Sequence, residues 1–396
     1  MSHKNNPNKP KRGVETRLAH PPYDPMTMHG FVNPPIVRGS TVLFESTAAM
    51  EDRQSLRYSY GLAGTPTTRV LEDALSDLEG AYGTALVPSG LAAVTLPLLA
   101  FASAGDHVLV VDSVYAPTRR FCHQVLKRMG VTVEYYDPHI GSDIAGLMRP
   151  ETSVVFLETP ASNTFEIQDV RAICDAAHAG GAVTMLDNTW ATPLFFRPLD
   201  HGVDLSIHAL TKYPGGHSDL LMGSVSANEA SWGKLLKMQT ALGINAAPDD
   251  CSLVLRGLKT MAVRLHHHQQ AALDLAHWLE AREDVLEVLH PALASFSDHE
   301  AFKRQFSGST GLFGVVVDGD RDAARRFLDA LEIFGLGYSW GGHESLAVLV
   351  DLSDRTIAKG PDRGSLLRLQ IGLENVGDLQ ADLERGFAAM AGGDAQ

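Results

Sequence analysis

Lys212 is the residue of this sequence whose setting most favours covalent chemistry. It follows the apolar, strand-like run 203–207 and precedes the turn Gly215-Gly216. Burial at such a place lowers the pKa of a lysine from its free value of roughly 10.4. An amine of this kind acts as nucleophile and base in Schiff-base chemistry with a carbonyl cofactor. Taken alone, Lys-Tyr-Pro-Gly-Gly favours a surface loop, so the accompanying residues decide the interpretation.

Asp187 is the first of these accompanying residues. It lies 25 positions before Lys212, at the end of the apolar run 182–186. A carboxylate at the C-terminal end of a buried parallel strand lies where ligands bind in open α/β sheets. There it could hold the protonated pyridine nitrogen of pyridoxal 5'-phosphate (PLP). By itself Asp187 fits a helix N-cap or a turn equally well. The two residues together, on consecutive strand ends, favour a cofactor site.

Longer motifs surround these two residues along the chain. They are YSYGLAGTPTT (58–68), LEGAYGTALVPSGLAAV (78–94), FLETPASNTFEI (156–167), MLDNTWATPLF (185–195), SIHALTKYPGGHSD (206–219), YSWGGHES (338–345) and LLRLQIGLE (366–374). By these collinear segments, from Tyr58 to Glu374, the chain resembles the Cys/Met-metabolism family of PLP-dependent enzymes, the trans-sulfuration enzymes. Within that family, Tyr-Ser-Trp-Gly-Gly looks most like the bacterial cystathionine β-lyases.

The resemblance implies a role for each candidate cofactor residue. Lys212 would carry PLP, Asp187 would hold the pyridine nitrogen, and Tyr115 would lie over the ring, although core packing is an alternative for this tyrosine. The turn between an apolar strand and a helix is a ready phosphate site, because free N–H groups and the helix dipole face the anion. The phosphate ligands implied in this chain are Ser89, Gly90, Leu91, Ser206, Thr211 and Tyr60.

Tyr60 has a special position in this scheme, since in the resembled family its segment reaches into the neighbouring subunit. Relatives carry a phosphate-binding arginine two residues later, where this chain has Leu62. Arg57 and Arg69 are the nearest replacements. Ordinary packing is the alternative role for Tyr60.

Substrate binding is implied at the C-terminal end of the chain. Arg368 is a charged residue inside an apolar strand-like run, and its fork geometry suits a bidentate grip on an α-carboxylate. A structural salt bridge is the alternative for Arg368. Ser339 and Trp340 lie on the segment that covers the substrate in relatives, and Tyr60 is a further candidate contact from the neighbouring subunit.

The activity implied by the resemblance is that of a carbon–sulfur lyase (EC 4.4.1 class). It would cleave L-cystathionine, or a related cysteine S-conjugate, by β-elimination to homocysteine (or another thiol), pyruvate and ammonia. The alternatives are a γ-acting relative, such as cystathionine γ-synthase, cystathionine γ-lyase or methionine γ-lyase, and a catalytically silent PLP-binding member. A nicotinamide-binding Rossmann enzyme is disfavoured because no strand leads into Gly-x-Gly-x-x-Gly.

Composition limits the other partners. With 396 residues and a formal net charge of −14, the chain is ample for a large core and unsuited to nucleic acid or an anionic membrane surface. Its three distant cysteines indicate neither a metal site nor a disulfide framework and favour the cytoplasm. The consecutive residues His266, His267 and His268 fan around a helix, so they are predicted to be solvated or at an interface rather than to bind a metal. We therefore expect a small amino-acid substrate, no metal, and a homo-oligomer built as a dimer of dimers.

The elements that must position these residues predict an α/β protein. Alternating strands and helices indicate a mainly parallel sheet, and the resemblance implies a large domain of the aspartate-aminotransferase-like fold type I plus a smaller C-terminal α+β domain. We predict a flexible tail (1–14) and Pro-rich extended arm within 1–57, the PLP-binding domain over 58–252, and a long helix with the small domain over 253–396. Strands are expected at 84–87, 107–111, 131–135, 154–157, 182–186, 203–207, 311–317 and 366–371, and helices at 68–79, 253–279, 321–333 and 376–390.

Overall fold

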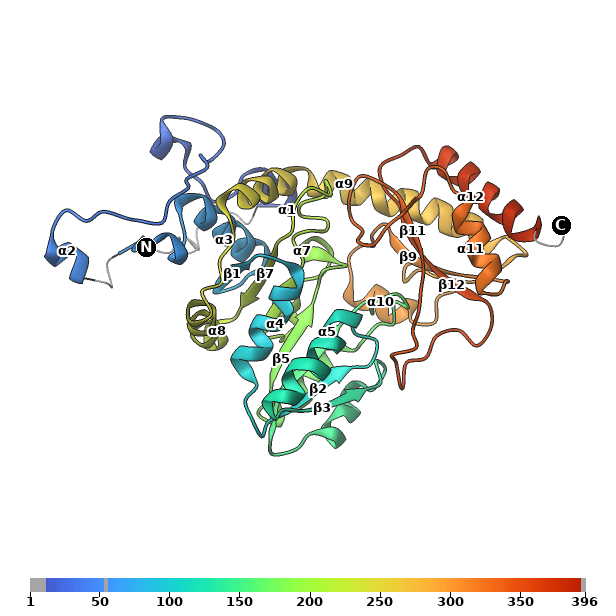
Figure 1. The fold of residues 1–396 in the computed structure, drawn as a ribbon, viewed down its shortest axis with the longest axis horizontal. Coiled ribbons are helices and arrows are strands. Elements are labelled where there is room, and N and C mark those ends of the chain that lie inside the picture. Colours follow the sequence, from blue (N-terminus) through green and yellow to red (C-terminus); the bar gives the residue numbers. More distant parts are fainter. Residues whose placement is uncertain (1–11, 53–55, 393–396) are drawn as a thin grey trace.

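The structure, a computed structural model, describes residues 12–52 and 56–392. Two β-sheets lie side by side, and one long helix runs from the first to the second (Figure 1). The chain builds the larger sheet first, and the smaller sheet contains only strands that follow the long helix. The predicted α/β fold, with a mainly parallel large sheet and a smaller second sheet, is confirmed.

The larger sheet has seven strands in the order β1-β7-β6-β5-β4-β2-β3. Only β7 runs antiparallel to its neighbours, so the C-terminal ends of β2, β4, β5 and β6 meet at one edge. The bounds are β1 Gly83–Val87, β2 His107–Val111, β3 Thr132–Tyr136, β4 Thr152–Glu158, β5 Val183–Asp187, β6 Leu205–His208 and β7 Gly223–Ala227. This edge contains three candidate residues: Asp187 ends β5, Lys212 follows β6 and Tyr115 follows β2.

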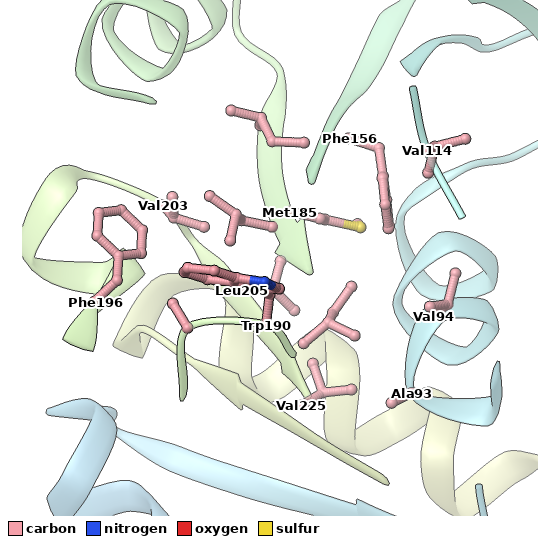
Figure 2. Packing of buried hydrophobic residues seen from close by; sticks show 14 of the residues in the cluster. Ala93, Val94, Val114, Phe156, Met185, Trp190, Phe196, Val203, Leu205 and Val225 are labelled. Atoms are coloured by element: carbon pink, nitrogen blue, oxygen red, sulfur yellow. The ribbon is translucent and has the colours of Figure 1, made fainter. Parts of the chain in front are cut away.

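Helices of the first sheet are α3 Pro66–Glu79, α4 Gly90–Phe101, α5 Ala116–Phe121, α6 Val170–Ala179, α7 Thr192–Phe195 and α8 Glu229–Ala241. The α3 helix begins at a capping box made by Thr65 and Thr68 and ends at Gly80, whose φ of 69° is left-handed. Side chains of α4 pack on the sheet: Figure 2 shows Ala93 and Val94 beside the strand residues Met185 and Val225 in the large hydrophobic core. The burial of this face fixes α4, and with it the turn that precedes it.

The smaller sheet has the order β10-β11-β12-β9-β8. Its strands are β8 Val285–Leu289, β9 Leu312–Val317, β10 Gly335–Leu336, β11 Leu346–Leu349 and β12 Ser365–Gln370, and its helices are α10 His299–Gln305, α11 Arg321–Asp329 and α12 Val376–Ala391. The α11 helix ends four residues before Ile333, where its end was predicted. The buried Asp382 accepts hydrogen bonds from the main-chain N–H groups of Glu332, Ile333 and Phe334, which draws this segment out of the helix.

The long helix α9, Pro248–Glu280, starts five residues earlier than predicted, with Pro248 in its first turn. It is the yellow helix that crosses from the first sheet to the second in Figure 1. Its first half contributes to the large core and its second half to a separate core under the small sheet. One of the three consecutive histidines departs from the prediction: His268 is fully buried and its Nδ1 lies 2.7 Å from the carbonyl oxygen of Ile371.

The N-terminal arm extends away from both sheets (Figure 1). Of the predicted flexible tail, residues 1–11 lie outside the described part of the chain. The expectation of a flexible tail through residue 14 is wrong at its end, since Val14 begins a helix, α1 (Val14–Ala19), which packs on α9 and contains the buried Leu18. A second short helix, α2, spans Thr47–Glu51 and is capped by Ser46. The arm otherwise exposes large apolar side chains, namely Met26, Phe31, Val32 and Leu43.

Within the described residues, no helix is both long and apolar enough to cross a membrane. The same residues contain no group of three or more histidine, cysteine, aspartate or glutamate side chains arranged to hold a metal ion. Cys122, Cys174 and Cys251 are buried and unpaired.

Candidate functional site

Lys212 lies just beyond the end of β6, half-buried under the loop that connects β10 to β11. Its Nζ donates a hydrogen bond of 2.6 Å to the Ser339 hydroxyl and lies 5.3 Å from the centroid of the Trp340 ring. Burial, helped by the nearby Arg368 guanidinium, lowers the pKa of Lys212 to about 8, whereas Asp187 acts in the opposite direction. A substantial part of this amine is therefore neutral near pH 8, the form that attacks a carbonyl.

Ser339 also contacts the candidate carboxylate-binding residue. Its carbonyl oxygen accepts a hydrogen bond of 3.1 Å from the Arg368 guanidinium, and Arg368 makes a longer contact of 3.5 Å to the Asn163 side chain. Ser339 has a φ of 81°, which is costly for a residue with a side chain. This backbone conformation turns the hydroxyl toward Lys212 while the carbonyl faces Arg368.

Arg368 forms no ion pair with any acidic side chain in the described chain, so the structural salt bridge considered from the sequence has no partner there. Burial lowers its pKa to about 10, and at neutral pH it remains charged. A half-buried cation whose donors are only partly used is suited to a carboxylate ligand.

Asp187 is the last residue of β5 and is fixed by its neighbour Thr189. The Thr189 hydroxyl donates to the Asp187 carboxylate and accepts a hydrogen bond of 2.9 Å from the Ala209 main-chain N–H. Thr189 also donates its own N–H to Asp187 at 3.0 Å. Burial raises the pKa of Asp187, while the Thr189 hydrogen bonds and Lys212 counteract that rise. Thr189 thus links Asp187 to the segment that carries Lys212.

Tyr115 lies after β2 and before α5, and its ring is about half exposed. Its main-chain N–H donates a hydrogen bond of 2.8 Å to the carboxyl of Glu158, the last residue of β4. Burial raises the pKa of the Tyr115 phenol, and the carboxylates of Glu158 and Asp187 add to the effect. The three candidate residues thus lie at the same edge of the sheet, where the charge of Asp187 influences the pKa of both Tyr115 and Lys212.

The turn to which the resemblance assigns the phosphate lies between β1 and α4, at the N-terminus of that helix. Ser89 is the N-cap, and its hydroxyl accepts a hydrogen bond of 3.1 Å from the Ala92 N–H. Gly90 and Leu91 open the helix, so their N–H groups have no partner within it. A Cβ added to Gly90 would lie 2.6 Å from the Ala209 Cβ, so only glycine allows this turn to approach the Lys212 segment. These donors fit an anion at a helix N-terminus.

The two predicted hydroxyl ligands of the phosphate differ in their surroundings. Thr211 is adjacent to Lys212, and its hydroxyl donates to the Met222 carbonyl at 3.1 Å and accepts from the Met222 N–H at 3.0 Å. Ser206, which is fully buried in β6, instead donates a hydrogen bond of 3.1 Å to the Glu79 carboxyl on α3. The structure therefore brings Thr211, but not the Ser206 hydroxyl, to the Lys212 segment.

Tyr60 is exposed, and an isolated β-bridge pairs its main chain with that of Thr41 in the arm. The two arginines considered as replacements at Leu62 differ. Arg69 is engaged, because it pairs with Glu72 at 2.6 Å and donates to the Ala63 carbonyl at 2.7 Å. Arg57 is exposed and lies 5.6 Å from the centre of the Tyr58 ring, with no ion pair among the described residues. Of the two, Arg57 is the more available for a ligand.

Comparison with known proteins identifies the family of this chain. The family model described as "Cys/Met metabolism PLP-dependent enzyme" matches residues 15–388. The chain belongs to this family. It is similar to a putative cystathionine beta-lyase of Rhizobium johnstonii, with 59% identity over 95% of this chain and 96% of the relative. It is 41% identical to the cystathionine beta-lyase MetC of Escherichia coli, over 91% of this chain and 94% of that protein.

Among solved structures, the chain resembles the cystathionine gamma synthase of Xanthomonas oryzae in complex with aminoacrylate and cysteine. The TM-score is 0.90 at 33% identity, covering 96% of this chain and 99% of the other. The overall fold is thus shared by relatives named for β- and γ-chemistry. PLP is the cofactor that family membership implies, and the donor set fits it: a lysine with a lowered pKa, a carboxylate fixed by Thr189, and free N–H groups at the start of α4.

Several residues of this site were not predicted from the sequence. Thr189 carried a local signal, since Asp-x-Thr is typical of an Asx turn in which a side chain binds the backbone two residues on. Glu158 and Asn163 carried none, because their contacts with Tyr115 and Arg368 span 43 and 205 positions of sequence. The pairing of Lys212 with Ser339 spans 127 positions.

Proposed function

We propose that this enzyme is a carbon–sulfur β-lyase that cleaves L-cystathionine to homocysteine, pyruvate and ammonia. The observation that carries the proposal is the position of Ser339, which contacts Lys212 through its hydroxyl and Arg368 through its carbonyl. A substrate whose α-carboxylate binds Arg368 would have its Cα held beside the Lys212 amine. The names of the relatives from Rhizobium johnstonii and Escherichia coli support the same activity.

Bound PLP supplies the electron sink that accepts the pair released when the Cα–H bond breaks. Lys212 Nζ takes that proton, and its lowered pKa suits it to act as a base near pH 8. Asp187 would bind the pyridine nitrogen and Tyr115 would lie against the ring. Ser89, Gly90, Leu91 and Thr211 would hold the phosphate, together with Tyr60 from a neighbouring subunit.

The β-lyase proposal needs proton transfer at Cα only, whereas a γ-acting enzyme also needs a proton removed at Cβ. Loss of the sulfur from Cβ leaves an enamine that water hydrolyses to pyruvate and ammonia. The competing γ-lyase reaction cleaves the other carbon–sulfur bond and gives 2-oxobutyrate, cysteine and ammonia. The difference lies in which thiol and which 2-oxo acid are released.

Product analysis with L-cystathionine tests this proposal. Chromatographic separation of the 2-oxo acids, together with identification of the thiol, should give pyruvate and homocysteine in equal amounts. Formation of 2-oxobutyrate and cysteine would establish a γ-lyase instead. A Lys212→Ala enzyme is the matched control, because it should produce neither pair.

We also infer that the enzyme is a homo-oligomer, at least a dimer, in the cytoplasm. The apolar side chains exposed on the N-terminal arm support an interface there, and burial in a second subunit would remove them from water. Closed two-fold symmetry would let each arm serve an identical partner. The three unpaired cysteines agree with a reducing compartment.

A further inference from the structure

Glu158 is a buried carboxyl group that the proposed function does not use. It is the last residue of β4, and its side chain is only 9% exposed. In the parallel pairing of β4 with β5 its register partner is Asp187. Adjacent strands are about 4.8 Å apart, so the two carboxyl groups arise side by side at the same edge of the sheet.

Two neighbouring buried carboxyl groups do not both ionise readily, because like charges repel and burial disfavours each charge. Burial and the neighbouring Asp187 raise the pKa of Glu158 well above its ordinary value, while the Tyr115 N–H and Arg355 counteract them. Asp187, in contrast, receives two hydrogen bonds from Thr189 and is also favoured as an anion by Lys212. The negative charge of the pair is therefore expected on Asp187.

The contact that Glu158 does make is with the main chain of the aromatic candidate. Its Oε2 accepts the hydrogen bond from the Tyr115 N–H at 2.8 Å. Tyr115 is the N-cap of α5, and no side chain of its own caps that helix. Glu158 thus fixes the residue at the junction between β2 and α5, from which the tyrosine ring projects.

We propose that Glu158 is a positioning residue whose carboxyl oxygen holds the Tyr115 main chain, and with it the ring, in place over the cofactor bound at Asp187. The inference rests on the proposed cofactor roles of Asp187 and Tyr115 but not on the reaction with cystathionine. Since the group acts as a neutral hydrogen-bond acceptor, an amide should replace it. A side chain without an acceptor should not.

The test compares Glu158→Gln with Glu158→Leu in the PLP-loaded enzyme without substrate. The Gln variant keeps an oxygen for the Tyr115 N–H, so the visible circular dichroism of the bound cofactor and the pH at which its absorbance changes should match the parent. The Leu variant should lose at least half of the dichroism, because the hydrogen bond that holds the Tyr115 main chain is lost. Glu166→Gln, a change of a partly buried glutamate whose side chain accepts a hydrogen bond from Thr164, is the matched control and should leave the dichroism unchanged.

Thermal unfolding of each apoenzyme shows whether a variant is folded, which separates a loss of positioning from a loss of folding. If the Leu variant does not fold, Glu158→Thr replaces it, because the threonine side chain is too short to reach Tyr115. A Gln variant that behaves like Leu, or a Leu variant with unchanged dichroism, overturns the inference. Asp187→Asn and Tyr115→Phe serve as reference variants. If neither alters the cofactor spectrum, the proposed cofactor assignment itself fails. If they do and Glu158→Leu does not, only the role of Glu158 fails.

Discussion

Two cations, Lys212 and Arg368, lie on either side of one serine. Their mutual repulsion is one reason why the pKa of Lys212 is lowered, and Ser339 separates them by offering a hydroxyl to one and a carbonyl to the other. A substrate carboxylate on Arg368 would neutralise one of the two charges. The pKa of Lys212 should therefore depend on whether a carboxylate is bound at Arg368.

The first prediction concerns the reactivity of Lys212 in the apoenzyme. Because its pKa is lowered to about 8, the rate of recombination with PLP should rise with pH and reach half its maximum near pH 8. Replacing Arg368 by methionine removes a like charge, so the pKa of Lys212 should rise and the midpoint should move to higher pH. Stopped-flow absorbance at several pH values measures both midpoints. An unchanged midpoint in the variant would show that Arg368 does not influence this amine.

The second prediction concerns substrate binding by Arg368. Loss of a charge-assisted, bidentate contact in Arg368→Ala should raise KM for the amino-acid substrate by about 10- to 100-fold while PLP remains bound. Steady-state kinetics and cofactor absorbance give the two readouts. Arg363→Ala, which removes a surface pair with Asp318, is the matched control and should leave KM unchanged. Loss of PLP with an unaltered KM would assign Arg368 a structural role.

At the scale of elements, the loop between β10 and β11 owes its close approach to Lys212 to one glycine. Gly341 has a φ of 82°, and a Cβ added there would lie 3.0 to 3.3 Å from main-chain atoms of Lys212 and Tyr213. Only the absence of a side chain lets this loop lie against the strand end. The position of Ser339 depends on that approach, since it precedes Gly341 by two residues.

The third prediction follows from this contact. Gly341→Ala should displace the loop and lower kcat/KM by about 10-fold or more, because backbone strain of roughly 1–3 kcal/mol must be relieved by movement. Gly337→Ala changes the same loop where φ is ordinary and the nearest atom is a flexible leucine methyl at 3.5 Å. Kinetics of the two variants should differ sharply. Equal activities would show that the loop tolerates a Cβ against Lys212.

The fourth prediction concerns Glu79 of α3, which is buried against Ser206. Burial raises its pKa to about 8, with the Ser206 hydrogen bond acting against the rise. The folded state therefore binds this proton more tightly than the unfolded state, in which the pKa is near 4.5. The contribution of Glu79 to the free energy of unfolding should fall as pH rises from about 4.5 to 8 and then level off.

Denaturant unfolding of the parent and of Glu79→Gln checks this dependence. The amide cannot ionise, so the variant should gain stability relative to the parent as pH rises from 5 to 9. A difference that is independent of pH would mean that Glu79 titrates normally.

Strands and long helices were the part of the structure that sequence patterns predicted well. The strand 107–111 matches its prediction, and the C-terminal ends of β5 and α9 lie one residue beyond theirs. Strands that are buried on both faces appear in the sequence as continuous apolar runs, which makes them predictable. Contacts between distant elements were not predictable in this way. In β6 successive side chains alternate in direction, and nothing local to Ser206 indicates that its hydroxyl binds Glu79. His268 was misplaced because three consecutive helical residues span so wide an arc that one of them faced the core.

At the scale of the whole molecule, the N-terminal arm that precedes Tyr60 leaves several large apolar side chains exposed to water. Phe31, Val32 and Leu43 are more than 70% exposed, while the polar contacts of the arm to α9, such as Arg38 with Asp249, lie at its surface. A second copy of the chain is the partner that the proposed oligomer supplies.

The fifth prediction tests whether the site is shared between chains. Tyr60→Phe and Lys212→Ala should each be poorly active, the first through weaker PLP retention. After subunit exchange, mixed dimers contain one site free of both changes, so activity should recover to about one quarter of the parent value in an equal mixture, by random pairing. Mass spectrometry of differently tagged subunits verifies the exchange. Properly exchanged mixtures that stay inactive would show that each site is built within one chain.

The order of elements along the chain has a consequence for the enzyme during its own synthesis. Every strand of the seven-stranded sheet lies between Gly83 and Ala227, together with Lys212 and the phosphate turn, whereas Arg368 belongs to β12, which begins only at Ser365. At about 5–20 residues per second, translation needs roughly 7–28 s to cross that interval. A nascent chain on the ribosome therefore contains the residues proposed to retain the vitamin-derived cofactor well before it contains the arginine proposed to bind the amino-acid substrate.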